Sequence, residues 1–224
     1  MKTKLLDSYS AQSIAALVAL ALLTSLTLVT PTHADSGEYK ITIQNISNTI
    51  VTPPAVALSK NRDAQFFTLG EEASEALEIL AEGGNTTDWV TYYETMNRTS
   101  ATAHDAPLMP GASTELRVSG NGNGYLYLGA MLLPTNDAFT GLNGVAVKGP
   151  RTQTFYTGSY DAGTEANTET NSTIPGPFGG EGYNADRDDV NFVHPHPGLH
   201  GNGDIDAGQY NWQDPVLKVT IERI

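Results

Sequence analysis

Residues 114–133 read TELRVSGNGNGYLYLGAMLL, and this stretch carries the strongest indication of the fold. Residues 114–119 are rich in β-forming residues, and residues 125–133 form an almost continuous apolar run. The Asn-Gly-Asn-Gly sequence between them is typical of a tight turn that joins two strands. The stretch therefore predicts two β-strands paired as a hairpin.

Strand patterns also mark the rest of the chain. Residues 38–46 alternate, with Tyr39, Ile41 and Ile43 on one side, and residues 216–224 alternate in the same way. Shorter β-rich runs cover residues 55–59, 144–148 and 152–156. We expect the last strand to lie beside the first, in an all-β protein with long loops.

One amphipathic helix is predicted over residues 71–82, followed by two glycines that end it. Alanine and leucine recur there at helical spacing, and we interpret its five glutamates as a solvated face. Residues 89–96 are aromatic and of undecided type. Residues 162–189 contain almost no large aliphatic residue, so we expect a long loop, and loops of that length are usually functional or disordered.

Composition excludes several classes of function. The formal net charge is −13, and phosphate binding needs a basic surface, so nucleic acid is not expected as a partner. The chain has no cysteine, which excludes a disulfide framework and thiolate metal sites.

Residues 1–34 have the features of an export signal. Lys2 and Lys4 give a positive start, an apolar core follows, and Thr32-His33-Ala34 offers a cleavage site. Threonine and serine interrupt the apolar run, which is short of the ~20 residues that a spanning helix needs. We expect an exported protein, secreted or periplasmic, with residues 35–224 as one domain and no membrane insertion after the signal is removed.

Two aspartates suggest a cation site. Asp137 and Asp161 each sit in a loop near a β-rich run, beside small residues that let the backbone turn. Carboxylate and carbonyl oxygens supplied in this way are typical ligands of a hard cation such as Ca²⁺. The alternative is that both are ordinary turn aspartates that cap loop amides.

Histidines suggest a second site. His194, His196 and His200 lie within seven residues of each other, and imidazoles at such spacing can bind Zn²⁺ or Cu²⁺. The alternative is a proline-rich surface loop in which the histidines pack or cap. Asp186, Asp188 and Asp189 could contribute more loosely to a nearby cation.

Motifs for nucleophilic catalysis are missing from the sequence. It contains no Gly-x-Ser-x-Gly and no Ser-x-x-Lys. His104-Asp105 is an adjacent pair, and adjacent residues rarely face the same substrate. The sequence therefore predicts a protein that is not an enzyme.

Several stretches, taken in order, resemble the spondin amino-terminal domain of F-spondin and mindin, and more closely its bacterial secreted relatives. They cover the opening strand, the helix, the two aspartate loops and the segment before the last strand, and they span nearly all of residues 35–224. The matching residues are 39–43, 73–77 with 80–84, 135–141, 160–165 and 212–216.

The resemblance implies a C2-like antiparallel β-sandwich that holds Ca²⁺ at one loop end. It implies Asp137 and Asp161 as carboxylate ligands and the carbonyl of Thr157 as the third, with Glu165 at a position where the family often has aspartate. Ala138 stands where animal members carry tryptophan, and their cysteines are absent here. The same animal partners are therefore not implied.

These observations lead to one main interpretation and two alternatives. The main one is an exported, non-enzymatic, calcium-binding adhesion or interaction module whose partner is an extracellular protein or glycan. The first alternative is a transition-metal-binding protein or metallo-enzyme that uses His194, His196 and His200. The second is a structural matrix or surface-layer component.

Overall fold

The structure is a computed structural model that describes residues 37–120 and 122–224. The predicted export signal over residues 1–34 lies outside the described residues. Within those residues, no helix has the length and apolar character that crossing a membrane requires.

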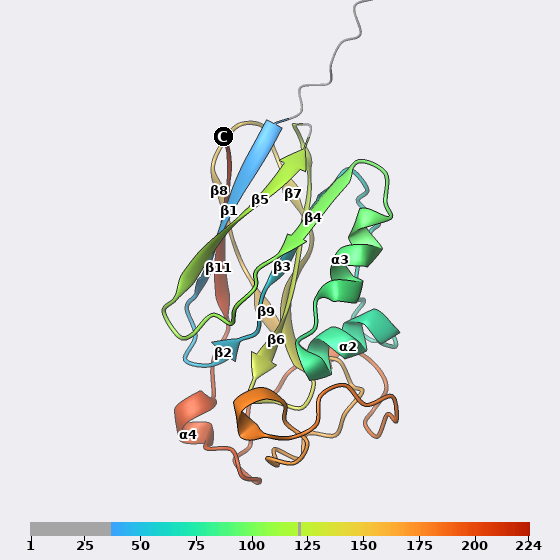
Figure 1. Ribbon diagram of the computed structural model, residues 1–224, viewed down its shortest axis with the longest axis vertical. Coiled ribbons are helices and arrows are strands. Elements are labelled where there is room, and N and C mark those ends of the chain that lie inside the picture. The colour runs from blue at the N-terminus through green and yellow to red at the C-terminus, as the bar shows by residue number, and fades with distance from the viewer. Residues whose placement is uncertain (1–36, 121) are drawn as a thin grey trace, which may run out of the picture. The chain divides into compact units, whose positions relative to one another are not determined.

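Two antiparallel sheets pack face to face (Figure 1). The first sheet has four strands, in the spatial order β5 (Ser113–Gly120), β1 (Gly37–Asn45), β11 (Leu217–Arg223) and β8 (Gln153–Tyr156). β1 pairs with β11 along its length, from Tyr39 opposite Arg223 to Asn45 opposite Leu217. This confirms that the last strand lies beside the first.

The second sheet carries the loops that hold both predicted metal sites. Its order is β10 (His194–Pro195), β9 (Gly158–Asp161), β7 (Ala138–Val147), β6 (Gly124–Leu133), β3 (Ala55–Ser59) and β4 (Thr99–Ala103), and β2 (Ile50–Val51) pairs with β6. The described residues thus form an all-β antiparallel sandwich with short helices, as the sequence predicted.

The hairpin predicted over residues 114–133 is wrong, although both of its strands exist. β5 pairs with β1 in the first sheet, while β6 pairs with β3 and β7 in the second. The two strands differ in burial, because β5 is exposed along one side and β6 is buried on both faces. A strand buried on both faces needs a layer on each side, so β6 belongs at the centre of the covered sheet.

Two helices supply that second layer. α2 (Glu75–Gly83) and α3 (Thr87–Glu94) cover the outer face of the second sheet in Figure 1. α2 begins later than predicted because Ser74 caps it, and the Ser74 hydroxyl accepts a hydrogen bond of 3.3 Å from Leu77 N. α3 resolves the undecided aromatic segment, and its Trp89 and Tyr93 are buried against the sheet.

The core therefore has two parts. One lies between the sheets and contains the inward residues of β1 and β11. The other lies between the second sheet and the helices, where Leu80 and Trp89 approach the backbone of Gly129 in β6. A Cβ atom at Gly129 would lie only 2.8 Å from Trp89 Nε1 and 3.1 Å from Leu80 Cδ1.

Residues 162–206 form a long excursion that includes the loop predicted over residues 162–189 and extends beyond it. Before β10 they contain a single short 3₁₀ helix, η1 (Gly176–Phe178), and no strand. They cross the lower end of the sandwich in Figure 1, and α4 (Ala207–Tyr210) follows before the last strand. The excursion begins directly after Asp161, the last residue of β9, and Ala162 N donates a hydrogen bond to the carbonyl of Asp137.

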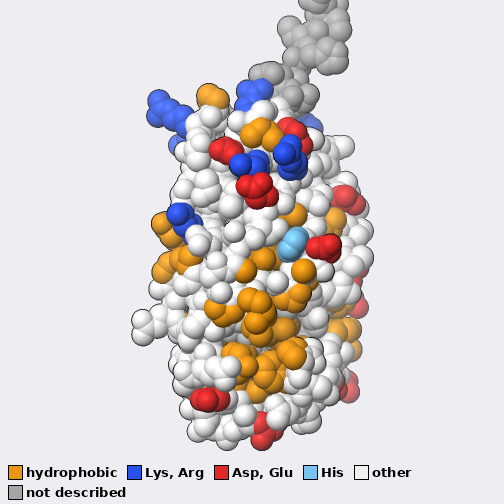
Figure 2. Space-filling model, turned by 60° about the vertical axis from the view of Figure 1, so that its left-hand side comes forward, with side chains coloured by type: hydrophobic (Ala, Val, Ile, Leu, Met, Phe, Trp, Pro, Cys, Tyr) orange, Lys and Arg blue, Asp and Glu red, His pale blue; other side chains and the backbone are white. Residues whose placement is uncertain are grey.

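Charged and apolar side chains are unevenly distributed on one face of the surface. In Figure 2 most Lys and Arg side chains of this face lie at its upper end, hydrophobic side chains lie over its middle and lower part, and acidic side chains also lie at its lower rim. On the first sheet, Lys40 forms ion pairs with Glu115 at 3.3 Å and Glu222 at 2.6 Å. Such exposed pairs contribute little to stability, so the cores described above are the main source of it.

Gly129→Ala tests how closely the helices pack on the sheet. We expect the free energy of unfolding to fall by about 1–3 kcal/mol, because the added methyl group forces Trp89 or Leu80 away from its position. Urea denaturation measures the change. Gly182→Ala is the control, since its nearest neighbour to an added Cβ is at 3.9 Å, and a similar loss in both variants would contradict the packing argument.

Candidate metal centre

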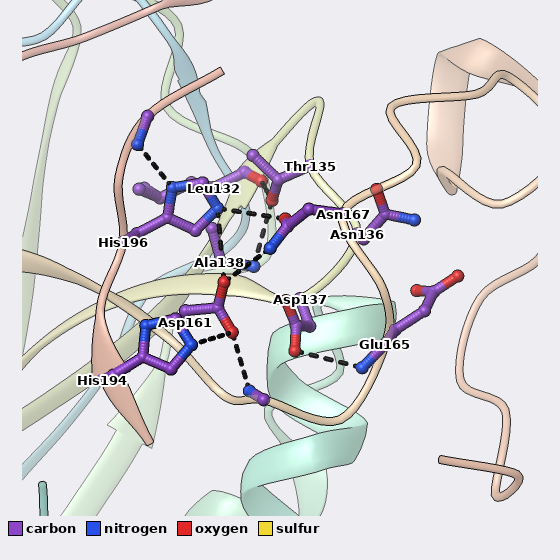
Figure 3. Close-up of polar contacts among 12 residues, drawn as sticks. Leu132, Thr135, Asn136, Asp137, Ala138, Asp161, Glu165, Asn167, His194 and His196 are labelled. Atoms are coloured by element: carbon purple, nitrogen blue, oxygen red, sulfur yellow. Dashed lines mark hydrogen bonds and ion pairs between the residues drawn. The ribbon is translucent and has the colours of Figure 1, made fainter. Parts of the chain in front are cut away.

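Asp137 and Asp161 lie at the same edge of the second sheet. Asp137 directly precedes β7, and Asp161 is the last residue of β9, opposite Ala138. Both aspartates are fully buried, and Figure 3 shows their carboxylates close together. Antiparallel pairing of β7 with β9 therefore brings together two loops that are more than twenty residues apart in the chain.

The carboxylate of Asp137 is only half satisfied. Its Oδ2 accepts hydrogen bonds from the backbone N–H groups of Thr164 at 2.8 Å and Glu165 at 3.2 Å. The Thr164 hydroxyl adds a third at 3.3 Å. Its Oδ1 is buried and has no hydrogen-bond partner among the described residues. A buried charged oxygen without a partner is costly, and a bound cation is one way to satisfy it.

Asp161 has more partners. Gly163 N donates to its Oδ1 at 2.8 Å, and Asn167 Nδ2 donates to its Oδ2 at 2.7 Å. His194 faces it from β10, with Nε2 at 3.4 Å from Oδ1, because β10 pairs with β9 in a register that sets His194 opposite Asp161. The two predicted metal sites are thus neighbours in the fold.

Electrostatics disfavour two negative charges here. Burial raises the pKa of Asp137 well above its ordinary value, the charge of Asp161 raises it further, and the backbone N–H groups oppose the shift. Burial also raises the pKa of Asp161, while Asn167 and His194 lower it. The charge of Asp189 raises the pKa of both.

Asp161, Asp189 and His194 form a group that can hold a metal ion. One ligand atom from each lies within 4.8 Å of the others. Asp161 is buried, and Asp189 and His194 are half-buried. The set offers carboxylate oxygens and one imidazole nitrogen, which are ligands for a divalent cation. The sequence predicts Asp189 only as a loose contributor beside Asp186 and Asp188, because nothing in this acidic run indicates which carboxylate turns inward.

Thr157 does not join this group. Its carbonyl accepts a hydrogen bond of 3.0 Å from Val216 N, which continues the pairing of β8 with β11 in the first sheet. It precedes β9, whereas Asp161 ends that strand, so four residues of extended chain separate them by about 13 Å. The described structure does not bring Thr157 into this group, so its role as third ligand stays a prediction.

Glu165 contributes its backbone and not its side chain. Its N–H group points to Asp137, while its carboxylate points away from both aspartates in Figure 3. Burial raises the pKa of Glu165 to about 7, against the lowering effect of a hydrogen bond with Asn136, and the charge of Glu82 adds to the rise. The side chain of Glu165, the fourth predicted ligand, therefore lies among other carboxylates, which include Glu82.

The three histidines do not assemble into one site. His196 is buried beneath the centre, where its ring stacks on Trp212 with centroids 5.2 Å apart, and burial lowers its pKa to about 3. Its Nδ1 accepts a hydrogen bond from Gly198 N, and its Nε2 lies 3.3 Å from Asn167 Oδ1. His200 Nδ1 instead lies 3.5 Å from Glu169. Only His194 reaches a group of ligands within the part of the chain that the structure describes.

Glu169 fastens the histidine segment to the loop. Its backbone has a φ of 55°, and its carboxylate accepts hydrogen bonds from three successive N–H groups, those of His200, Gly201 and Asn202. The last two distances are 2.7 and 3.1 Å. A residue held in this conformation needs such support from its surroundings. These hydrogen bonds hold the backbone of residues 200–202 against the loop that contains Glu169.

Arg187 fastens the acidic segment to α2. Its guanidinium pairs with Glu72 at 2.8 Å and with Glu78 at 2.6 Å, and it also donates to the carbonyl of Ala73. This anchor lies two residues before Asp189. The position of Asp189 in the centre thus depends on an ion pair with the helix.

The prediction that all five glutamates around the helix are solvated is wrong for two of them. Glu78 and Glu82 are 3% and 1% exposed, and each has a buried oxygen without a hydrogen-bond partner among the described residues. Glu82 Oε2 accepts a hydrogen bond of 2.9 Å from Asn184 N. The sequence could not reveal this, because the long loop that covers them has no apolar pattern to predict its path.

Stability of the metal-free protein should depend on pH through these raised carboxyls. A carboxyl with a raised pKa stabilises the fold below its unfolded pKa, and this contribution is lost as pH rises through the folded pKa. For Glu165 that window runs from 4.5 to about 7. We expect the free energy of unfolding, measured with urea in chelator, to fall across it, and Glu165→Gln to reduce the fall. An equal slope in Glu165→Gln and the exposed control Glu94→Gln would contradict this assignment.

Arg187→Met tests the anchor of the acidic segment. It leaves Glu78 buried without its cation, so we expect a loss of about 2–3 kcal/mol in the free energy of unfolding. Arg151→Met is the matched control, because Arg151 is exposed, and it should change stability by less than about 0.5 kcal/mol. Chemical denaturation compares the two. Equal stability of both variants would show that the anchor is dispensable.

No model of a known protein family matches the chain, and no curated protein sequence matches it. The resemblance to the spondin amino-terminal domain therefore stays a prediction.

Proposed function

We propose that this protein is an exported, non-enzymatic interaction module of the spondin type, and that one divalent cation organises its loop end. Asp137, Asp161 and Asp189 supply the carboxylate ligands. The observation that carries the proposal is the buried Oδ1 of Asp137, which has no hydrogen-bond partner among the described residues and lies beside Asp161.

Charge balance supports a cation. Two fully buried carboxylates and a third half-buried one meet in a protein with a formal net charge of −13. Their nearest positive group is His194, which is charged only when protonated. A divalent ion would neutralise the group and replace a repulsion between buried charges with attraction.

Calcium is the first candidate because carboxylate oxygens dominate the set, and Ca²⁺ accepts further oxygens from backbone and water. The ion would join the start of β7, the end of β9 and the segment before β10. The full burial of both aspartates favours a structural ion over catalysis on a substrate. Export rests on the predicted signal over residues 1–34, and the partner is proposed to be an extracellular protein or glycan.

Thermal unfolding with and without Ca²⁺ tests the site. At a hundredfold excess over the dissociation constant, the melting temperature of the purified protein should rise by about 5–10 °C, because the ion binds only the folded state. Asp137→Asn and Asp161→Asn should abolish the rise. In chelator, Asp137→Asn should be at least as stable as the unchanged protein, because it removes one of two repelling charges.

Asp105→Asn is the control, since the Asp105 side chain is 96% exposed and lies outside the group. It should keep the full response to Ca²⁺. Calorimetry that detects no binding of Ca²⁺, Mn²⁺ or Zn²⁺ would falsify the metal site.

The imidazole of His194 favours a second candidate, a zinc-binding protein. Nitrogen ligands suit Zn²⁺, and His194 Nε2 is already 3.4 Å from an Asp161 oxygen. His194→Ala separates the two. Calcium binding should survive this change, whereas tight Zn²⁺ binding should be lost, and elemental analysis of protein purified without a histidine tag shows which ion it carries.

A further inference from the structure

An uncharged groove lies beside the loop end and outside the metal centre. It has a volume of about 600 Å³. Residues 46–48, which follow β1, form one wall, residues 211–213, which precede β11, form the other, and Pro110 lies before β5. The groove is open to solvent over most of its extent, so a ligand would lie along it and not be enclosed.

The chemistry of the lining is that of a neutral ligand. None of its residues carries a formal charge, although the protein has a formal net charge of −13. An ionic ligand would find no opposite charge here. The polar groups are those of Ser47, Asn48, Asn211 and Gln213, and amides offer donors and acceptors together.

Two of these polar side chains, Asn48 and Gln213, can still form hydrogen bonds with a ligand. Asn48 Nδ2 donates to the carbonyl of Gln209 at 3.3 Å, which leaves its carbonyl oxygen for another donor. Gln213 is exposed. Asn211 has a structural role, because its Oδ1 accepts from Leu199 N and Trp212 N and so holds the Trp212 backbone in place.

Apolar surface completes the groove. Ile46 is 40% exposed, and Pro110 and Trp212 lie in the same lining. Trp212 is only 7% exposed, and its ring packs against that of His196 at 40°, so it is a fixed and largely covered part of the wall. Amide groups beside a rigid apolar wall match a molecule with hydroxyl groups on its edges and C–H groups on its faces.

We propose that this groove binds a neutral oligosaccharide. Hydroxyl groups of the sugar bond to the amides of Asn48 and Gln213, and its C–H faces contact Ile46, Pro110 and Trp212. The inference rests on the proposed role as an interaction module and names its partner class. It uses none of the proposed metal ligands.

The test uses the indole N–H signals of the protein in a nuclear magnetic resonance titration. The chain has two tryptophans, and Trp212→Phe assigns their signals. The probes are cellotetraose, maltotetraose and chitotetraose, each up to about 10 mM, which reaches weak affinities. We expect at least one to shift the Trp212 signal saturably and to leave that of Trp89, which is 1% exposed, unchanged.

Variants locate the binding. Asn48→Ala combined with Gln213→Ala should weaken it about tenfold or more through lost hydrogen bonds. Gln65→Ala combined with Asn202→Ala removes two exposed amides elsewhere and should leave it unchanged. The Trp89 signal reports in every variant whether the core remains folded.

Three results would overturn the proposal. One is the absence of a saturable shift with all three probes, and another is binding that both double variants retain equally. The third is binding that chelator or Asp137→Asn abolishes, which would assign the ligand to the cation. Saccharide binding that persists in chelator supports the groove even where the metal site fails, so the two proposals are tested separately.

Discussion

The burial of two like charges side by side is the constraint on which the loop end of this protein depends. Asp137 and Asp161 are brought together by the pairing of β7 with β9, and neither is exposed. Backbone N–H groups from residues 163–165 satisfy only part of their oxygens. A cation bound at this end, as proposed above, would offset the remaining electrostatic cost.

Keeping that pair buried requires the long excursion over residues 162–206. The excursion has little apolar pattern of its own, so polar contacts fix its path. Arg187 holds the acidic segment against α2, and Glu169 holds the histidine segment through successive N–H groups. α2 in turn rests on the second sheet, where Gly129 leaves room for Leu80 and Trp89. The position of the two aspartates thus depends on the second sheet, on α2 and on the loop that covers them.

His196 links the two proposed sites. Its Nε2 lies 3.8 Å from Asp161 Oδ2, and its ring stacks on Trp212, which lines the groove. Burial keeps this imidazole neutral, because its pKa is lowered to about 3. It therefore acts as a packing element between the metal centre and the groove, and not as a third histidine ligand.

The sequence by itself determined most of the longer strands, because alternation and apolar runs report burial directly, but it did not predict β4, β9 or β10. It also singled out Asp137 and Asp161, although Asp161 ends β9 and does not lie in a loop. Only the tertiary structure decided which strands pair. It separated β5 from β6, left Thr157 outside the centre, turned the Glu165 side chain away, and brought in Asp189 and His194. The physical reason is that the pairing of strands and the path of a polar loop depend on contacts between residues far apart in the chain. Local sequence patterns do not encode these contacts.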